Sequence, residues 1–483
     1  MEAPNPVPHA LITRQTVPLP KVIEILPVDK PVRAEITVPG SKSITNRALV
    51  LGALGEGETA LYGALWSEDT QVMVECLQEL GFMVNVAPDP HESCNRTITI
   101  YGKGGVVPRG GTPDQPLELF VGNAGTTARF LTALVCLGQG AYRLHGVPRM
   151  HERPQAALFQ GLRALGYRIE APNEKLPAVV HGAGARPGRC VVSIEESSQF
   201  ASALILCSVK GRWQIEISGD NVEESPYVVM TYKLLATFPH LGGGLQIEPD
   251  ASSASYFLAA GQLLPAPKRA GDSLVSVLTA QQGDISIARW PETDWQVDRR
   301  FPEVVDRNAA LRKGLEFHRS PELHADLTND YHGAFENPPI SRRCDLGDSI
   351  MTAMVLAPFA LEAIAFTELG RLRVQECERV AAMRTELTKC GIKVVEAGDT
   401  LTVYPSQPHG AEIETYNDHR IAMCFATLGL KIPGVRIKNP SCVKKTFPNF
   451  LEKLSTPPPN GLGATILDAA TRRVLSGGEL LAE

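Results

Sequence analysis

Eight short segments of this chain carry charged or small polar side chains, and they are spread over its whole length; six of them contain Lys or Arg. They are PGSKSITNR (39–47), GNAGTTAR (122–129), GVPRMHERP (146–154), ESSQF (196–200), DLGDSIMT (345–352), RVQECER (373–379), YNDHRIAM (416–423) and KKTFP (444–448). Most join a cation or a small hydrogen-bond donor to an expected helix start, where free N–H groups and the helix dipole favour anions. We therefore expect one site, assembled from the whole chain, for small and multiply charged anions.

The first segment places Lys42 and Arg47 near the start of an expected helix. A Pro-Gly turn follows the alternating strand AEITV, and Ser41 or Ser43 can cap the helix. A lysine is a compact cation and an arginine a planar fork, so the two can hold different oxygens of one ligand. The alternative is a capped surface helix with two solvated cations. The segment is not a phosphate-binding P-loop, because the spacing GxxxxGK[ST] is absent from it.

Three further segments supply groups suited to a phosphate or a hydroxyl. Gly125 lets a backbone approach a ligand closely, and Arg149 lies next to an expected helix. Ser197, Ser198 and Gln199 are neutral hydrogen-bonding groups. The alternatives are a glycine-rich turn before a buried helix and a plain serine N-cap.

Acidic residues occur among these cations. Asp348 begins an apolar helical run, where it acts either as an N-cap or as a general base inside a cationic site. Glu376 and Arg379 are spaced to share one helix face, and a surface ion pair is the alternative interpretation. The last two segments add polar and charged side chains at His419, Arg420 and Lys445.

The bulk composition limits the class of protein. A chain of 483 residues is too long for one ordinary core, so we expect two domains. The net charge of −6 gives no broad basic field for nucleic acid or an anionic membrane. Ten cysteines are scattered without a CxxC pair, which favours reduced thiols in the cytoplasm and no zinc site. No apolar run is long enough to span a membrane, and no secretory or transit signal is expected.

Three segments share one pattern, at 68–87, 151–171 and 376–397. Each begins with a charged cluster, continues with apolar residues at helical spacing, and ends the helix on Gly81, Gly166 or Gly391. An alternating strand and then a second strand follow in each case. Because the copies are irregularly spaced, we expect a pseudo-symmetric α/β protein rather than a solenoid. The alternative is that this pattern is merely common in α/β proteins.

The remaining segments have weaker patterns. Residues 266–344 contain several prolines and little periodicity, which predicts loops and short strands on the surface. We expect residues 1–20 to be a mobile extension and the stretch after Ser455 to be an appendage beyond the last packed element.

In its motifs, the chain resembles the 5-enolpyruvylshikimate-3-phosphate synthase family (3-phosphoshikimate 1-carboxyvinyltransferase) of enolpyruvyl transferases. PGSKS..NR, GNAGT, PRM..RP, SSQ, NDHR.AM and KTFP run in the family's order from about residue 36 to 450. The resemblance implies an α/β (α+β) fold of two domains, each with three βαβαββ units in an inverse α/β barrel-like arrangement. It implies one domain from 20–41 and 245–455, a second from 42–244, terminal extensions at 1–19 and 456–483, and a site in the cleft between the domains.

The resemblance also implies a reaction. In the family, the 5-hydroxyl of shikimate 3-phosphate adds to phosphoenolpyruvate, and the tetrahedral ketal then loses phosphate to give an enol ether. This step belongs to the shikimate pathway of aromatic amino acid biosynthesis, and glyphosate occupies the phosphoenolpyruvate site. The implied protein is a cytoplasmic monomer that needs no cofactor and no metal. Its partners are these two small substrates, neither a nucleic acid nor a membrane.

Site residues follow from the motifs position by position. The resemblance implies that phosphoenolpyruvate is held by Lys42, Gly125, Arg149, Arg379, Arg420 and Lys445. It implies that shikimate 3-phosphate is held by Lys42, Ser43, Arg47, Ser197, Ser198, Gln199, Tyr227, Asp348, Arg371 and Gln375. The implied catalytic residues are Lys42, Asp348, Glu376 and His419. By the resemblance, Asp348 exchanges a proton with the hydroxyl and Glu376 exchanges one with the methylene carbon. His419 gives polar support.

The chain departs from the family at two of these positions. Arg371 and Gln375 stand where the family usually has Asn and Lys, so we hypothesise that Arg371 supplies the charge that Gln375 lacks. Residues 281–344 are also unlike the family. These departures leave open an enolpyruvyl transferase for another hydroxyl acceptor, such as one related to the UDP-N-acetylglucosamine enzyme. A non-catalytic binding protein of the same fold, or a P-loop-like kinase or other anion-binding α/β protein, is a more distant alternative.

Overall fold

The computed structural model describes residues 18–219, 226–265, 285–308, 310–311, 314–315 and 337–482. Apart from its last residues, the N-terminal extension expected from the sequence lies outside these ranges. Within them, no helix is long and apolar enough to cross a membrane. The same residues contain no group of three His, Cys, Asp or Glu side chains arranged to hold a metal ion. All ten cysteines are described, and none forms a disulfide.

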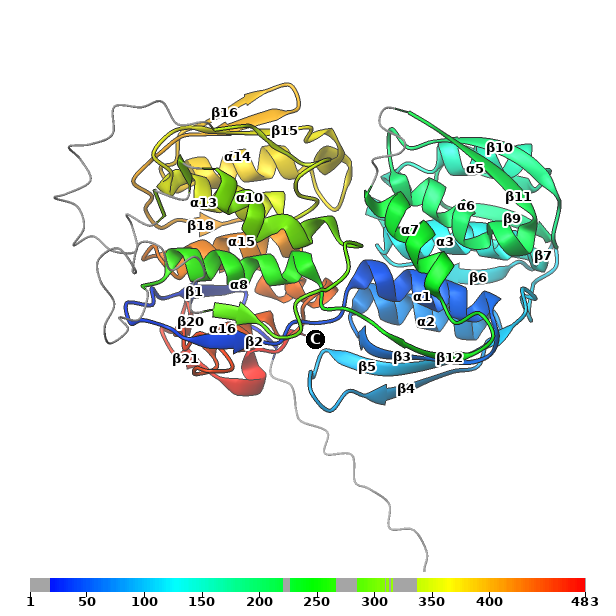
Figure 1. Ribbon diagram of the computed structural model, residues 1–483, viewed down its shortest axis with the longest axis horizontal. Helices are drawn as coiled ribbons and strands as arrows, with labels where there is room; N and C mark the ends of the chain where they lie inside the picture. The colour runs from blue at the N-terminus through cyan, green and yellow to red at the C-terminus, as the bar shows by residue number, and fades with distance from the viewer. Residues whose placement is uncertain are drawn as a thin grey trace, which may run out of the picture.

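Two separate clusters of buried hydrophobic side chains divide the described residues. One cluster runs from Ile44 to Ile247. The other contains residues 23–38 and 254–482. Figure 1 shows the corresponding parts of the chain as two lobes side by side. We call residues 42–247 the N-lobe, and residues 18–38 with 254–482 the C-lobe.

The chain crosses between the two cores after Val38 and again after Ile247. The second crossing follows strand β12 (Gly243–Gln246), which pairs with β3 (Glu56–Leu65) of the N-lobe. These observations support the proposed division into two domains, with the second boundary a few residues later than residue 244.

Ten strands and seven helices of the N-lobe are described. Its other strands are β4 (Val84–Pro88), β5 (Asn95–Lys103), β6 (Leu117–Phe120), β7 (Gln139–His145), β8 (Arg168–Glu170), β9 (Ala178–Ala183), β10 (Gly188–Ser193) and β11 (Trp213–Ser218). Its helices are α1 (Lys42–Leu54), α2 (Glu68–Glu79), α3 (Gly125–Cys136), α4 (Pro148–Glu152), α5 (Ala156–Ala164), α6 (Ser198–Gly211) and α7 (Pro226–Thr237).

The C-lobe contains the N-terminal strands and the second half of the chain. Its strands are β1 (Val22–Ile25), β2 (Ala34–Ile36), β13 (Ile285–Ile287), β14 (Ile340–Ser341), β15 (Ile364–Thr367), β16 (Val394–Ala397), β17 (Thr400–Val403), β18 (Glu412–Ile413), β19 (Val435–Lys438), β20 (Ile466–Asp468) and β21 (Val474–Leu475). Its α-helices are α8 (Ala251–Leu263), α10 (Phe301–Arg307), α13 (Ile350–Leu356), α14 (Arg379–Lys389), α15 (His419–Gly429) and α16 (Phe450–Ser455). Its 3₁₀ helices include η2 (Val297–Arg300), η5 (Gly370–Val374) and η6 (Pro440–Lys445).

Three four-stranded sheets repeat one topology. Their strand orders are β12-β3-β5-β4, β6-β7-β9-β8 and β14-β15-β17-β16. In each sheet the first pair is parallel and the next two pairs are antiparallel. Helices α2, α5 and α14 precede the antiparallel hairpins, as the repeated sequence pattern predicts. The three helices are followed by Gly81, Gly166 and Gly391, with φ of +88°, +86° and +76°, a backbone conformation that favours glycine.

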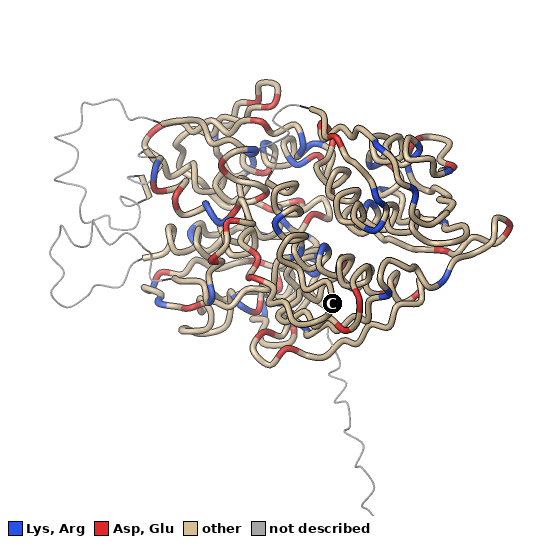
Figure 2. Tube along the Cα trace, turned by 45° about the vertical axis from the view of Figure 1, so that its right-hand side comes forward, with Lys and Arg blue, Asp and Glu red and all other residues tan. Residues whose placement is uncertain are grey.

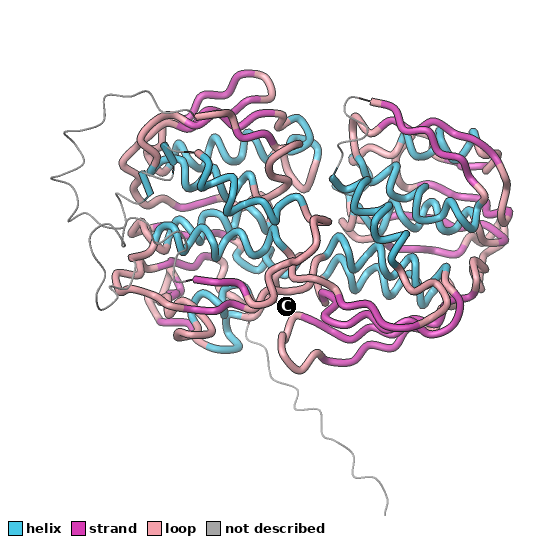
Figure 3. Tube along the Cα trace, viewed as in Figure 1, coloured by secondary structure: helices cyan, strands magenta, loops and turns pink. Residues whose placement is uncertain are grey.

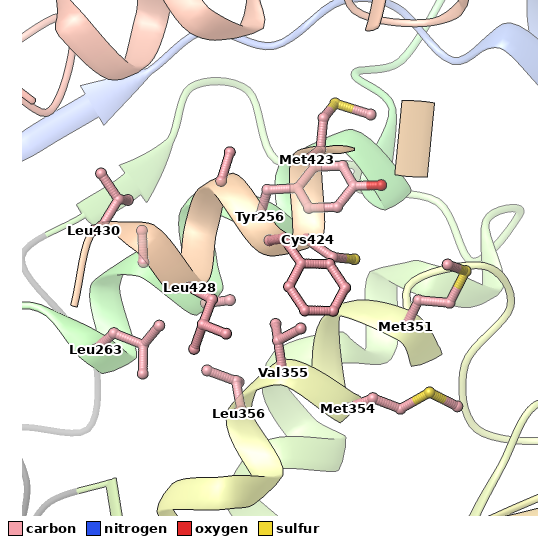
Figure 4. Packing of buried hydrophobic residues seen from close by; sticks show 14 of the residues in the cluster. Tyr256, Leu263, Met351, Met354, Val355, Leu356, Met423, Cys424, Leu428 and Leu430 are labelled. Carbon is pink, nitrogen blue, oxygen red and sulfur yellow. The ribbon is translucent and has the colours of Figure 1, made fainter. Parts of the chain in front are cut away.

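Helices fill the middle of each lobe, and sheets cover them from outside (Figure 3). Every residue of α3 and of α15 is buried. Figure 4 shows how α15 packs against α8 and α13 through side chains such as Leu428, Leu263 and Val355. Residues at the N-terminal ends of α3, α6 and α15, namely Thr126, Ser198 and His419, line one cavity.

Two expectations about the weaker segments are wrong. Residues 456–482 are not an appendage, because β20 pairs with β1 and the side chains of Ile466, Leu475 and Leu480 are buried in the C-lobe core. The described part of 266–344 is not merely a surface segment, since Phe301 and Val304 of α10 are also buried there. The rest of 266–344 lies outside the described residues. In both stretches the apolar residues are too few to show a clear period, and contacts with distant strands and helices bury them.

Candidate active site

A cavity between the lobes collects most of the residues that the sequence singles out. Eight Lys or Arg side chains and four Asp or Glu side chains line its described walls. Away from the cavity, basic and acidic residues are intermixed over both lobes, as Figure 2 shows. The cations that line the cavity are Lys42, Arg47, Arg129, Arg153, Arg342, Arg371, Arg379 and Arg420.

Arg379 is the centre of the C-lobe wall. Its Nε lies 2.7 Å from Asp418 Oδ2 and its Nη2 lies 2.7 Å from Glu376 Oε2. The side chain is only 1% exposed, so the pair with Glu376 is a buried ion pair and not the surface pair that the spacing allowed. Asp418 also caps α15 by accepting a hydrogen bond from Arg420 N. One buried carboxylate therefore holds the start of a helix and an arginine together.

Asp348 lies among three guanidinium groups. Its carboxylate oxygens are 3.0 Å from Arg420 Nη2, 3.1 Å from Arg342 Nη2 and 3.8 Å from Arg379 Nη1. Burial alone raises the pKa of Asp348, but these three charges outweigh it and hold the pKa well below its usual range. The carboxylate is therefore ionised at neutral pH and can accept a proton.

Asp298 fixes the loop that carries Asp348. It accepts hydrogen bonds from Gly347 N (2.7 Å) and Ser349 N (3.1 Å), and one from the hydroxyl of Ser252. The sequence did not identify Asp298, because it lies in the divergent segment and 50 residues from the loop it holds. Only contact between distant segments reveals this role.

Glu376 lies between cations of different segments. Besides Arg379, its Oε1 is 3.3 Å from Lys445 Nζ. Burial raises the pKa of Glu376, but the charges of Arg379 and Lys445 lower it well below its usual range. Lys445 is also 4.0 Å from Asp69, which is 3.0 Å from Lys42 Nζ. The two lysines, one from each lobe, thus meet at Asp69, a residue that the sequence analysis passed over.

His419 lies at the start of α15 and is 1% exposed. Neither ring nitrogen has a hydrogen-bond partner among the described residues. Burial and the charge of Arg420 lower the pKa of His419 well below its usual range. The ring is therefore neutral and can donate or accept one hydrogen bond in the cavity.

Arg47 is the buried cation of the N-lobe wall, on the inner side of α1. Its guanidinium donates to Thr231 Oγ1 (2.7 Å), Ser202 Oγ (3.1 Å) and the carbonyl oxygens of Ser43 (2.9 Å) and Tyr227 (3.2 Å). All four acceptors are neutral. Burial lowers the pKa of Arg47 to about 10, so the group remains charged at neutral pH. The expected serine cap of α1 is absent, because Asp250 Oδ2 accepts from Lys42 N instead.

Two further arginines of the N-lobe wall also have neutral partners. Arg129 donates to Gln199 Oε1 (2.8 Å) and to the carbonyl of Pro154 (3.0 Å), and Arg153 donates to the carbonyl of Asn123 (2.9 Å). Burial, and then the charge of Arg153, lower the pKa of Arg129. The sequence motifs contain both arginines, but their spacing gave no reason to assign them to the site.

Gly125 does not line the cavity but lies directly beside these arginines. A Cβ at this position would lie 2.5 Å from Arg129 Nη1 and from Arg153 Nη2. Arg149, in contrast, is 37% exposed, pairs with Glu152 and donates to the carbonyl of Gln375. The structure therefore places Arg149 at the rim, and Arg129 and Arg153 at the wall.

The sequence-predicted residues of the acceptor side come together from both lobes. Ser197 caps α6 by accepting from Gln199 N, and Ser198 Oγ accepts from Arg371 Nη1 at 3.3 Å. Gln375 Oε1 accepts from Arg379 Nη1. Among the predicted site residues, all line the cavity except Gly125, Arg149 and Lys445, which lie beside it.

Comparison with known proteins agrees with this geometry. The family model for EPSP synthase (3-phosphoshikimate 1-carboxyvinyltransferase) matches residues 27–241 and 343–454. The chain belongs to the EPSP synthase family. It is 36% identical to the 3-phosphoshikimate 1-carboxyvinyltransferase of Trichormus variabilis over 89% of this chain and 98% of that protein. It is also 36% identical to that of Opitutus terrae, over 91% of this chain and 98% of the relative.

Solved structures of an EPSP synthase and of another enolpyruvyl transferase share the fold. The EPSP synthase of Acinetobacter baumannii superposes with a TM-score of 0.67 at 20% identity, covering 92% of this chain and 99% of that one. The enolpyruvyl transferase NikO of Streptomyces tendae gives 0.60 at 16% identity, covering 95% of this chain and all of that one. The predicted two-domain α/β enolpyruvyl-transferase fold is thereby confirmed. Residues 242–342, between the matched ranges, include most of the segment that looked unlike the family.

Proposed function

We propose that this chain transfers the enolpyruvyl group of phosphoenolpyruvate to the 5-hydroxyl of shikimate 3-phosphate and releases phosphate. The observation that carries the proposal is the excess of cations in the cavity, eight against four carboxylates among its described lining residues. The two substrates bring two phosphates and two carboxylates, whose negative charge is opposite in sign to that excess. The curated relatives, named for this activity, agree with it over nearly the whole chain.

The site separates into two proposed subsites. We assign phosphoenolpyruvate to the side of Lys42, Arg379, Arg420 and Lys445, next to Gly125, with Arg149 at the rim. We assign shikimate 3-phosphate to the side of Ser43, Arg47, Tyr227, Arg371 and the serines that begin α6, with Gln199 between the subsites. Both walls belong to one chain, which supports action as a monomer.

The reaction needs a base and an acid. Asp348, held ionised by three guanidinium groups, is placed to take the proton of the attacking hydroxyl as its oxygen bonds to C2 of phosphoenolpyruvate. A proton must reach C3 at the same time, which gives the tetrahedral ketal. Phosphate then leaves C2 and C3 loses a proton, which restores the double bond.

Glu376 is the proposed group for the proton at C3. In the free protein its pKa lies well below its usual range, because Arg379 and Lys445 favour the ionised form. When the substrate phosphate and carboxylate engage these cations, their effect on Glu376 weakens and its pKa rises. The substrate thus prepares the carboxyl to carry a proton. Lys42 and the neutral His419 support the developing charge through hydrogen bonds.

Release of phosphate tests the proposal. The purified protein is mixed with phosphoenolpyruvate and shikimate 3-phosphate, and with each substrate alone. Saturable release that requires both substrates supports the proposed reaction. Binding of phosphoenolpyruvate without release would instead support transfer to a different hydroxyl acceptor, a second candidate favoured by Arg371, Gln375 and the unmatched residues 242–342.

A further inference from the structure

Arg342 is a buried cation of the active-site cavity that the site residues expected from the sequence do not include. It follows β14, and its backbone N donates to Thr367 O (3.1 Å) of the neighbouring strand β15. Its side chain is 6% exposed, and one nitrogen, Nη2, reaches Asp348. Its Nε is buried and has no hydrogen-bond partner among the described residues. A buried donor without an acceptor is costly unless a ligand supplies one.

Arg371 faces the same part of the cavity. Its Nη2 donates to Ile194 O (2.7 Å) and its Nη1 to Ser198 Oγ (3.3 Å), both in the N-lobe. No described carboxylate lies within ion-pair distance of its guanidinium. Burial, and then the charge of Arg342, lower the pKa of Arg371 to about 10, because a neighbouring cation disfavours the charged form.

The two arginines lie where the active-site cavity meets a second cavity. Tyr227, Arg342 and Arg371 line both the catalytic cavity and a second cavity that continues outward from it. The second cavity is also lined by Glu195, Asp399 and the paired side chains of Arg343 and Glu368, so its charge beyond the two arginines is acidic on balance. An anion that enters from the catalytic side would therefore stop at the arginine pair.

Gln375 cannot provide this charge. Its side chain is neutral, and its Oε1 accepts a hydrogen bond from Arg379. Its backbone oxygen is engaged by Arg149 Nη2 at 3.1 Å. Among the described cations, Arg342 and Arg371 are the two that line both this cavity and the neighbouring one.

We propose that Arg342 and Arg371 together bind the phosphate group of the hydroxyl acceptor, with Ser198 as a neutral partner, and so determine that the enzyme selects a phosphorylated acceptor. The inference rests on the proposed function. Arg371 connects the phosphate to the N-lobe, while Arg342 connects it to the loop of Asp348. Binding of the phosphate thereby positions the acceptor hydroxyl relative to the group that takes its proton.

The test compares an acceptor with and without its phosphate. We would measure the dissociation constants of shikimate 3-phosphate by calorimetry and of shikimate by competition, without phosphoenolpyruvate. Each charge-assisted contact supports roughly 10- to 100-fold of affinity. Arg342→Gln and Arg371→Gln should each weaken shikimate 3-phosphate binding by about that factor and leave shikimate binding nearly unchanged. Arg342→Lys should retain part of the preference, because it keeps a charge.

Two control variants come from the same segments. Arg343→Gln and Arg373→Gln remove arginines that form ion pairs with Glu368 and Glu396, and neither should change the preference for the phosphorylated acceptor. A loss of affinity that is equal for both acceptors, or no loss, would overturn the inference. Failure of the wild-type protein to release phosphate from the two substrates would instead overturn the proposed function, and is measured separately.

Discussion

The two lobes build opposite walls of one cavity, but their arginines have different partners. On the C-lobe wall, Arg379 and Arg420 are ion-paired with carboxylates of the same lobe. On the N-lobe wall, Arg47, Arg129 and Arg153 donate only to neutral oxygens among the described residues. An arginine with a carboxylate partner stabilises the free protein, whereas one without a counter-ion keeps its charge for an anionic ligand.

The pKa shifts of the arginines differ between the two walls in the same way. The carboxylates around Arg379, led by Asp418, raise its pKa against the effect of burial. Burial lowers the pKa of Arg129, and the carboxylates of Glu376 and Glu196 offset this only in part. The difference implies that the C-lobe wall combines ligand binding with stability and proton transfer, while the N-lobe wall gives up stability for binding alone.

The largest expected effect is on the C-lobe carboxylate that takes the proton. Asp348→Asn should lower kcat by about 10²- to 10⁴-fold, because the amide cannot accept the hydroxyl proton. Binding of shikimate 3-phosphate should be kept or become tighter, since the guanidinium groups lose a competitor. Phosphate release and calorimetry measure the two effects. Asp399→Asn, at a side chain that is 61% exposed, is the control, and an unchanged kcat in Asp348→Asn would contradict the assigned role.

Removing the central cation of the same wall should reduce stability in addition to weakening phosphoenolpyruvate binding. Arg379→Met leaves Asp418 and Glu376 buried without their partner, which should reduce the free energy of unfolding by about 3–5 kcal/mol. Urea unfolding measures the change. Arg373→Met removes a surface arginine that contacts Glu378, Glu396 and Asp399, and should cost about 1 kcal/mol or less. Equal losses in the two variants would remove the distinction between buried and surface pairs.

The N-lobe wall should respond in the opposite way. Arg129→Met removes a cation with neutral partners, so the KM of at least one anionic substrate should rise by roughly 10- to 100-fold. The free energy of unfolding should fall much less than in Arg379→Met, because no carboxylate is left unpaired. Steady-state kinetics and urea unfolding of both variants test the comparison directly. If Arg129→Met unfolds as easily as Arg379→Met, the proposed division between the walls is wrong.

A substitution with a smaller expected effect tests the geometry of the N-lobe wall. In Gly125→Ala, the new Cβ would displace the ends of two flexible guanidinium groups, at Arg129 and Arg153, rather than backbone. The KM for phosphoenolpyruvate should therefore rise by about tenfold or less, with the protein still folded. Glyphosate should inhibit the variant less than the wild type, because we assign both ligands to the same place. Inhibition curves measured side by side would contradict this placement if they coincide.

The smallest expected effect is a dependence of stability on pH. The folded-state pKa of Asp348 is lowered, so its stabilising contribution is present above its unfolded-state pKa of about 3.9 and is lost as the pH falls below that value. Urea unfolding near neutral pH and near pH 3 should therefore show a smaller loss of stability in Asp348→Asn than in the wild type. An identical loss would mean that other carboxylates account for the whole dependence.

Much of the fold was predictable because its signals are local. Helical spacing, a terminal glycine and an alternating strand lie within about 20 residues, and the resulting units at Gly81, Gly166 and Gly391 are confirmed. The family resemblance is confirmed as well, since its motifs are short and run in order. Residues 456–482 were misjudged because strands such as β20 are stabilised by pairing with β1, which lies more than 400 residues earlier.

The sequence by itself determined the repeated units, the family and the segments that carry the charged groups. Only the tertiary structure decided which charges meet: Asp69 with two lysines, Asp298 with the loop of Asp348, and Arg342 beside Arg371. The physical reason is that the energy of a charge depends on its distance to other charges and on its burial. Both quantities are set by contacts between segments that are distant in the chain, so no local pattern contains them.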